Sequence, residues 1–197
     1  VDGAYGAAGL AAPSIRDQFT GIERADSFIV DPHKWLFAPF DCCALLYRTP
    51  EHARHAHRQH GDYLEVLYDG IWNPSDYAHH LSRRARGLPF WFSLATHGTD
   101  AYAAAVEQTL LLTQQAADLI DASEHLELIL PPHLSVVIFK RSGWDAGAYT
   151  QWSKQLLEHG DGFVMPTKYQ GESVLRLCIV NPTTSSDDLA FIVASLI

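Results

Sequence analysis

A lysine in a tight turn is the residue of this sequence best placed to do covalent chemistry. Lys34 follows an apolar run at residues 27–30 and an Asp-Pro-His turn at residues 31–33, and it precedes a Trp-Leu-Phe run at residues 35–37. A lysine amine reacts with a carbonyl group only when it is neutral, which burial or a neighbouring cation favours. Because the apolar flanks suit a buried side chain, we interpret Lys34 as a candidate Schiff-base lysine. A surface lysine beside a turn is the alternative.

The first residues of the sequence indicate a preceding part of the protein. Residues 1–6 read Val-Asp-Gly-Ala-Tyr-Gly, which is typical of a buried strand that runs into a glycine-rich loop. No residues precede this run to form the rest of the strand. We therefore expect the sequence to be a fragment, whose upstream half is either cut away or carried by another chain.

Composition excludes several classes of protein. The 197 residues are 47% hydrophobic and 19% charged, as in a soluble globular protein. We expect no membrane span, because no apolar stretch reaches about 18 residues. The net charge of −9 argues against nucleic-acid binding, and the cluster at residues 83–86 is interpreted as solvated or ion-paired arginines. Three cysteines and no signal-peptide pattern predict a cytoplasmic protein.

The pattern of apolar residues predicts alternating strands and helices. Helices are expected at residues 51–60, in a long stretch that includes Val106 and Ile120, at residues 146–159 and after a capping box at Ser185. A long loop is expected at residues 61–80. Strands are expected at residues 27–30, 44–47, 134–139 and 174–180. We place a domain boundary near residue 100, between part of a large α/β domain (1–100) and a small α+β domain (101–197).

Several segments together carry a family resemblance. They are Ser-Phe-Ile-Val-Asp-Pro-His-Lys-Trp at 27–35, the first six residues, Phe-Asp-Cys-Cys-Ala at 40–44, Leu-Ser-Arg-Arg-Ala-Arg at 81–86 and Leu-Arg-Leu-Cys-Ile-Val-Asn-Pro at 175–182. In this order they resemble the group II pyridoxal-phosphate-dependent amino-acid decarboxylases, which include the aromatic-amino-acid, glutamate, cysteine-sulfinate and diaminobutyrate decarboxylases. The resemblance covers essentially the whole chain but less than half of a family member. It implies the α/β, aspartate-aminotransferase-like type I fold.

The resemblance implies roles for five residues around pyridoxal 5'-phosphate. Lys34 would hold the cofactor as a Schiff base. Asp2 would bond to the pyridine nitrogen and keep it protonated, because a nearby opposite charge favours the charged form. Ala4 would pack on one face of the ring, and His33 would donate to the phosphate. Asp31 would either contact the site or only shape the turn.

Two further residues are implied to act on the substrate. Tyr63 resembles the tyrosine of the family's mobile catalytic loop, where a phenol can protonate the α-carbon after carbon dioxide leaves. A packing aromatic is the alternative. Arg176, on the opposite side of its predicted strand from Leu175 and Leu177, is a candidate for binding a substrate carboxylate. An arginine that is ion-paired at a sheet surface is the alternative there.

The resemblance predicts decarboxylation of an L-amino acid to its amine and carbon dioxide, by a homodimer. The substrate itself stays open. Alternatives are an aldehyde synthase or a carbon–carbon lyase on the same fold, or an inactive half of a split or nicked decarboxylase that needs its N-terminal portion. We expect no metal site, and we interpret His52, His55, His57 and His60 as partly exposed histidines rather than ligands.

Overall fold

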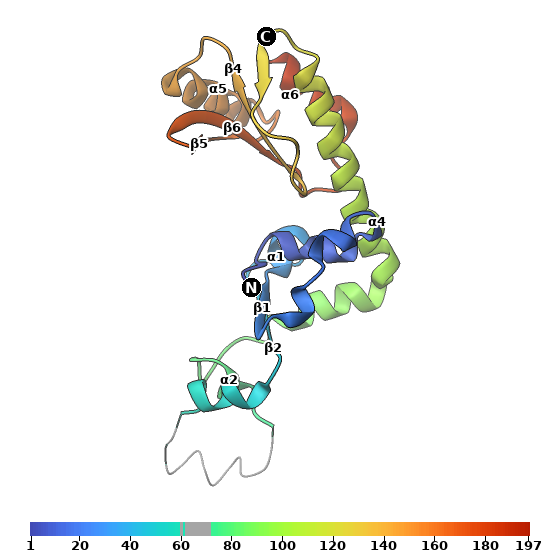
Figure 1. Ribbon diagram of the computed structural model, residues 1–197, viewed down its shortest axis with the longest axis vertical. Helices are drawn as coiled ribbons and strands as arrows, with labels where there is room; N and C mark the ends of the chain where they lie inside the picture. The colour runs from blue at the N-terminus through green and yellow to red at the C-terminus, as the bar shows by residue number, and fades with distance from the viewer. Residues whose placement is uncertain (60, 62–71) are drawn as a thin grey trace. The chain divides into compact units, whose positions relative to one another are not determined.

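The chain folds into two compact units (Figure 1). The computed structural model describes residues 1–59, 61 and 72–197. Unit 1 consists of residues 1–10 and 15–98, and unit 2 consists of residues 11–14 and 99–197. The division into part of a large domain over 1–100 and a small domain over 101–197 of a longer protein stays a prediction.

Short elements make up the first half of the chain. In order they are η1 (Gly6–Ala11), η2 (Pro13–Phe19), η3 (Ile22–Arg24), β1 (Ser27–Val30), α1 (Pro32–Trp35), β2 (Ala44–Tyr47), α2 (Pro50–His57) and η4 (Pro74–Tyr77), where η denotes a 3-10 helix. The helix α4 (Gly87–Asp121) follows. The predicted strands at residues 27–30 and 44–47 are confirmed.

The N-terminal segment lies alongside β1 as a parallel neighbour. The Gly3 N–H donates to the Ile29 carbonyl at 3.1 Å, and the Ile29 N–H donates to the Val1 carbonyl at 3.2 Å. On its other side β1 pairs with β2 in an antiparallel register that sets Phe28 opposite Leu46. The strand β1 is therefore hydrogen-bonded on both edges, and its carboxyl end is held in a defined place.

A single helical turn, α1, begins where β1 ends. Pro32 occupies the first turn of this helix, where the missing N–H of proline costs nothing and its fixed φ suits the helix. Trp35 closes the turn with a fully buried side chain that stacks on the Tyr5 ring, with 5.3 Å between ring centroids. The buried tryptophan thus fixes α1 against the N-terminal segment that contains Tyr5.

A glycine interrupts α4 at the division between the units. Gly98 has φ 79° and ψ 162°, which lie outside the helical region. Glycine adopts such values without a steric penalty because it has no Cβ. Residues 11–14 belong with the part of α4 beyond this glycine. The Ser14 N–H and hydroxyl donate to the Glu107 carboxylate at 2.9 Å and 2.6 Å.

Unit 2 is an antiparallel sheet covered by helices (Figure 1). The strands β3 (Leu126–Leu128), β4 (Val136–Arg141), β6 (Glu172–Cys178) and β5 (Met165–Tyr169) lie in this order across the sheet. The helices α5 (Ala146–His159) and α6 (Ser186–Ala194) pack on it with the end of α4. The unit is an α+β structure, as the sequence predicts.

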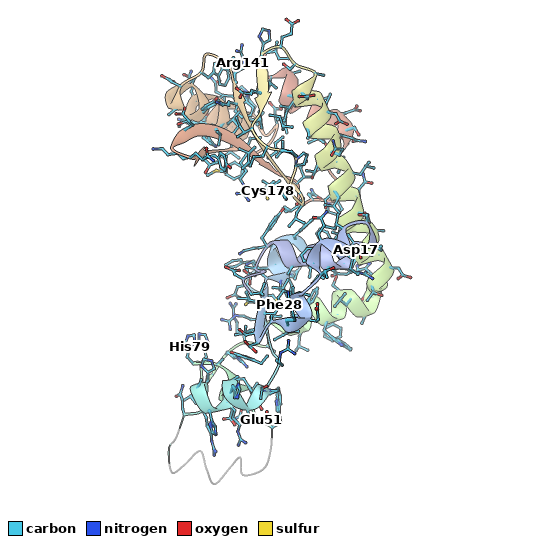
Figure 2. The ribbon with its side chains drawn as sticks, viewed as in Figure 1. Asp17, Phe28, Glu51, His79, Arg141 and Cys178 are labelled. Carbon is cyan, nitrogen blue, oxygen red and sulfur yellow. The ribbon has the colours of Figure 1, made fainter. Side chains whose placement is uncertain are left out.

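The core of unit 2 lies between the sheet and these helices. Cross-strand pairs Val137–Leu177 and Phe139–Leu175 supply the sheet side of the core. The helices supply Leu112, Ala116, Ile120, Tyr149, Trp152, Leu156, Leu189, Ile192 and Val193. Arg141, labelled in Figure 2, ends β4, and its Nε donates to the Leu196 carbonyl at 2.7 Å. This bond ties the end of the chain to the sheet.

Helix caps follow the sequence closely in this unit. The Asp145 side chain accepts from the Ala148 N–H at 2.8 Å, which starts α5. The predicted capping box is confirmed, since Ser185 and Asp188 exchange side-chain-to-backbone bonds at the start of α6. The predicted helix at residues 146–159 matches α5 at both ends.

Strand ends differ from the expectation by two residues. The strand expected at 134–139 runs from Val136 to Arg141, because Leu134 has φ 52° and belongs to a turn closed by bonds between His133 and Val136. The strand expected at 174–180 starts earlier and ends at Cys178. The short strands β3 and β5 were not predicted.

The helix expected at 51–60 ends at His57. His60 and residues 62–71 of the expected loop lie outside the described residues.

Within the part of the chain that the structure describes, no helix is both long and apolar enough to cross a membrane.

Replacing Phe139 by alanine tests the core of unit 2. Phe139 is fully buried opposite Leu175, so we expect Phe139→Ala to lower the free energy of unfolding by about 3–5 kcal/mol. Denaturant titration followed by tryptophan fluorescence measures the change. Phe191→Ala is the matched control, because that ring is half exposed, and we expect a loss below about 1 kcal/mol. Equal losses for the two variants would contradict this packing.

Candidate active site

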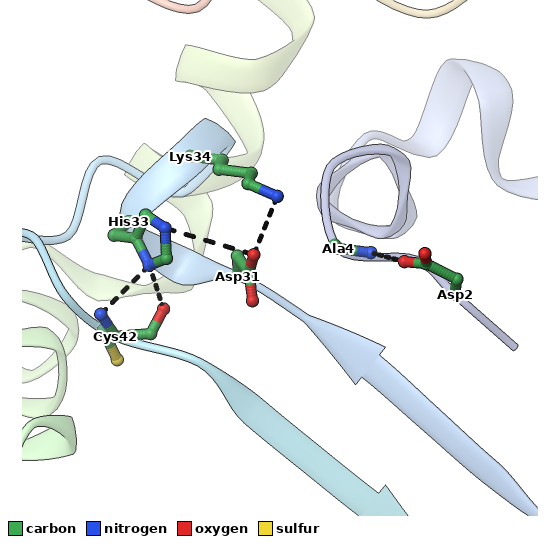
Figure 3. Close-up of polar contacts among 6 residues, drawn as sticks. All are labelled: Asp2, Ala4, Asp31, His33, Lys34 and Cys42. Carbon is green, nitrogen blue, oxygen red and sulfur yellow. Dashed lines mark hydrogen bonds and ion pairs between the residues drawn. The ribbon is translucent and has the colours of Figure 1, made fainter.

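Five of the predicted site residues gather where β1 ends beside the N-terminal segment. Asp31, His33 and Lys34 come from the β1–α1 junction, and Asp2 and Ala4 come from the segment parallel to β1. Figure 3 shows the Lys34 amine and the Asp2 carboxylate extending toward the same region from these neighbouring segments. The Asp31 N–H joins the two segments directly, because it donates to the Ala4 carbonyl at 2.9 Å.

Lys34 forms an ion pair with the carboxylate three residues before it. Its Nζ lies 2.8 Å from Asp31 Oδ2, and the Lys34 side chain is 42% exposed against 12% for Asp31. The hydrogen bond to Asp31 raises the pKa of Lys34 above its usual value, and desolvation of the amine opposes this without reversing it. The charge of Asp2 adds to the increase. The amine is therefore an ammonium ion in this state of the chain.

The expectation that Lys34 is a buried amine is wrong for this chain on its own. The apolar flank does bury a side chain, but that side chain is Trp35 rather than Lys34. Because α1 has only one turn, burying Trp35 against Tyr5 directs the neighbouring lysine out of the core. Any further burial of the amine has to come from groups other than the residues that the structure describes.

The Asp31 carboxylate interacts with Lys34, Cys43 and His33. Burial alone would raise the pKa of its carboxyl, but hydrogen bonds from Lys34 and from the Cys43 thiol lower the pKa below the usual value. Partial desolvation and the bond to Asp31 raise the pKa of the Cys43 thiol to about 11. Asp31 is thus a carboxylate at neutral pH, and Cys43 is a neutral donor to it.

His33 is held by the backbone of the segment before β2. Its Nδ1 lies 2.5 Å from the Cys42 carbonyl oxygen and 3.0 Å from the Cys42 nitrogen. Nδ1 accepts from the Cys42 N–H in one tautomer and donates to the Cys42 carbonyl in the other, and in both Nε2 lies 4.0 Å from the Asp31 carboxylate. The Phe40 ring meets the imidazole edge-on at 5.0 Å. The imidazole therefore has one ring nitrogen fixed and the other facing the site.

Asp2 and Ala4 are ordered by a local hydrogen bond. The Ala4 N–H donates to Asp2 Oδ1 at 3.0 Å (Figure 3). Between them, Gly3 leaves no room for a side chain, because a Cβ there would lie 2.6 Å from the Ala7 Cβ and 2.8 Å from the Ile29 carbonyl oxygen. This close approach keeps Asp2 next to β1.

Two arginines of the cluster at residues 83–86 pair with Asp41, a residue that was not singled out from the sequence. Asp41 Oδ1 lies 2.9 Å from Arg84 Nη2 and 3.0 Å from Arg86 Nε, which confirms the ion-paired interpretation of these two arginines. With His33 and Cys43 they line an open hollow in unit 1, whose described lining does not include Lys34. The cluster of arginines was a visible signal, but no sequence pattern identified their partner.

Two predicted substrate residues are not brought to this site by the described structure. Arg176 lies on β6 in unit 2, opposite Ile138 on the neighbouring strand, and its Nη2 donates to the Cys178 sulfur at 3.4 Å. Its place on the strand face away from Leu175 is confirmed. Tyr63 lies outside the described residues. The roles of both stay predictions.

The described histidines of α2 do not form a metal centre. The His57 Nε2 lies 3.4 Å from the Tyr47 hydroxyl. Among residues 1–59, 61 and 72–197, no three His, Cys, Asp or Glu side chains come together in a way that could hold a metal ion.

Comparison with known proteins identifies the family. Residues 1–142 match the pyridoxal-dependent decarboxylase conserved domain, and the chain belongs to this family. The aromatic-L-amino-acid decarboxylase of Bacillus atrophaeus is 28% identical, over 95% of this chain and 41% of that protein. The 3,4-dihydroxyphenylacetaldehyde synthase of Aedes aegypti is 30% identical over 97% of this chain and 37% of that protein. This chain thus spans less than half the length of these relatives.

Solved structures confirm the predicted fold. The structure of Oryza sativa TDC with PLP and tryptamine has a TM-score of 0.85 and 23% identity, and the match covers all of this chain and 44% of that one. The mouse CSAD structure in its apo form has a TM-score of 0.85 and 24% identity, with the same coverage. The chain therefore has the fold of part of these enzymes, as the resemblance implied.

Replacing Gly3 by alanine tests the geometry that holds Asp2. The added Cβ collides with the Ile29 carbonyl oxygen, so residues 1–4 must move away from β1. We expect Gly3→Ala to lower the free energy of unfolding by about 1–3 kcal/mol, measured by denaturant titration. Gly87→Ala is the control, because nothing lies within 4 Å of its Cβ position, and we expect little change. A Gly3→Ala protein as stable as the control would contradict the close pairing.

Proposed function

We propose that the protein containing this chain is a pyridoxal-phosphate-dependent decarboxylase of an L-amino acid, with Lys34 as the Schiff-base lysine. The observation that carries the proposal is the presentation of an amine and a carboxylate, Lys34 and Asp2, from neighbouring segments within the region that matches the family. The decarboxylases among the curated relatives support the reaction class.

The side chains at this edge suit the chemical groups of pyridoxal 5'-phosphate. An aldehyde needs an amine, which Lys34 provides, and a pyridine nitrogen needs an acid, which Asp2 provides. When Nε2 of His33 carries a hydrogen, it can donate that hydrogen to the phosphate. Asp31 suits the phosphate poorly because both carry negative charge, so we assign its carboxylate to Lys34, its partner at 2.8 Å.

When bound, the cofactor supplies a ring that accepts the electrons left behind when carbon dioxide departs. Asp2 keeps the proton on the ring nitrogen, because its negative charge favours the charged form of that nitrogen. Lys34 must give up its proton before its amine can bond to the aldehyde carbon. Ala4, with no side chain beyond Cβ, leaves space for a planar ring beside the N-terminal segment.

Two residues complete the proposal on the strength of the resemblance alone. Tyr63 delivers a proton to the α-carbon of the substrate after decarboxylation. Arg176 binds a carboxylate of the substrate. The substrate is an amino acid whose side chain the described residues do not identify.

We further propose that the active protein is a cytoplasmic homodimer that includes the portion upstream of this chain. Unit 1 exposes several large apolar side chains, namely Phe40, Trp72, Leu88, Trp91 and Phe92. Large apolar side chains that are exposed in this way suit a surface that other protein covers in an assembly. Because Lys34 is itself half exposed, covering this unit would also supply the burial that the amine lacks.

Removing the lysine amine tests the proposal. In the whole protein with cofactor added, we expect Lys34→Ala to abolish both the visible absorbance of the imine and turnover, measured by spectrophotometry and release of carbon dioxide. The matched control is Lys168→Ala on β5, an exposed lysine in unit 2, which should keep both signals. A Lys34→Ala protein that retains the imine absorbance would refute the assignment.

Removing the phenol tests the role of Tyr63. We expect Tyr63→Phe to slow amine formation by about 10²–10⁴-fold, the usual contribution of a positioned proton donor. Aldehyde and hydrogen peroxide, formed with dioxygen as the oxidant, should account for part of the product. Chromatographic quantification of amine and aldehyde measures the partition. Tyr169→Phe on β5 is the control, and unchanged amine formation by Tyr63→Phe would exclude the proposed role.

A further inference from the structure

The contact between Asp31 and Lys34 suggests a function for a residue whose role the sequence left open. Asp31 precedes the first residue of α1, the position at which an aspartate normally caps the helix with its side chain. Here the side chain makes no capping bond, and the Lys34 N–H donates instead to the Asp31 backbone carbonyl at 2.9 Å. The carboxylate is therefore free to bond to Nζ, at 2.8 Å.

We propose that Asp31 is a positioning residue that holds Lys34 as an ammonium ion before the cofactor binds, so that this ion pair must open before the amine can react. The inference rests on the proposed function, because it assigns Asp31 a part in loading the same lysine. The ion pair belongs to the cofactor-free protein, and its opening is a step that precedes catalysis.

The position of the Asp31 carboxylate is determined by more than its contact with the lysine. The Asp31 N–H donates to the Ala4 carbonyl, which fixes the backbone of Asp31 against the N-terminal segment. The Cys43 thiol donates to the same carboxylate from the strand side. The side chain is only 12% exposed, whereas Lys34 is 42% exposed. The acid is thus held by contacts on several sides, and the lysine is the more exposed partner of the pair.

The charges that face Lys34 all favour its protonated form. Asp31 makes the direct contact, Asp2 acts from the neighbouring segment, and Cys43 lies beyond Asp31. The Cys43 thiol is neutral, because its pKa is about 11, so it does not contribute a charge at neutral pH. His33 faces Asp31 at 4.0 Å and competes for the carboxylate only when the imidazole is protonated.

This arrangement has a definite consequence for reactivity. The opposite charge of Asp31 raises the pKa of Lys34, and each unit of such an increase lowers the neutral fraction of an amine about tenfold. Asp31 therefore keeps the reactive form of Lys34 scarce until a ligand displaces the pair.

Competitive labelling of the amine in the cofactor-free whole protein tests the proposal. The protein is exposed to trace acetic anhydride across a pH series, and acetylation of Lys34 is quantified by peptide mass spectrometry against Lys168, the exposed lysine on β5. We expect Asp31→Asn to move the labelling midpoint of Lys34 about 1 unit or more to lower pH. Below the midpoint, Lys34 of the variant should label about tenfold faster than in the wild type.

Two variants separate the contact from general charge. Asp26→Asn removes a fully exposed carboxylate that faces Arg48, and it should leave the Lys34 midpoint unchanged. Asp2→Asn removes a charge that acts on Lys34 without the direct bond, and it should cause a smaller shift than Asp31→Asn. An unshifted midpoint in Asp31→Asn, or an equal shift in Asp2→Asn, would overturn the proposal.

The wild-type protein provides a test that does not depend on a variant folding. Its Lys34 should label with a midpoint above that of Lys168, and a midpoint below it would overturn the proposal by itself. These labelling results are independent of the proposed function. A protein that shows the Asp31-dependent midpoint but never forms the imine would retain the ion pair and lose the decarboxylase assignment, whereas imine formation with no such dependence would do the reverse.

Discussion

The hydrogen bonds between the N-terminal segment and β1 are the constraint on which the candidate site depends. Gly3, Ile29 and Asp31 contribute the N–H groups of this ladder, and each bond adds about 1 kcal/mol of net stability. These hydrogen bonds matter more for the positions of the site residues than for the stability of the fold. The ladder sets Asp2 and the β1–α1 junction at the same edge, although they are far apart in sequence. Without it, the acid and the amine have no fixed relation.

The charges at this edge explain how one arrangement can serve two states. In the chain as it stands, Asp31 neutralises Lys34 across a short ion pair, and the amine is unreactive. Asp2 is the second acid near the amine, and its carboxylate accepts from the Ala4 N–H of its own loop. Two acids near one lysine leave one of them available for a second basic group. A pyridine nitrogen is such a group, which is why the arrangement fits the cofactor of this family.

Local chemistry made much of the fold predictable. The capping box at Ser185 and the apolar spacing of α6 identified the last helix, because these signals act within a few residues. Strand ends were less accurate, since Leu134 adopts a left-handed turn that its own side chain does not signal. The short strands β3 and β5 form because β4 and β6 present free edges to them, a tertiary effect.

The candidate site was predictable in membership but not in geometry. The motif around Lys34 and the segment around Asp2 could be found by resemblance, and the structure brings them to one edge. The ion pair with Asp31 could not be foreseen, because it depends on a missing capping bond and on the burial of Trp35 in place of the lysine. The ion pair of Arg86 with Asp41 could not be foreseen either, because the two residues are far apart in the sequence.

The most direct test of the account is a crystal structure of the whole protein with pyridoxal 5'-phosphate bound. The account predicts continuous density from Lys34 Nζ to the aldehyde carbon and a carboxylate oxygen of Asp2 within about 3 Å of the pyridine nitrogen. A cofactor bound through another lysine, or one whose ring nitrogen lies away from Asp2, would contradict it.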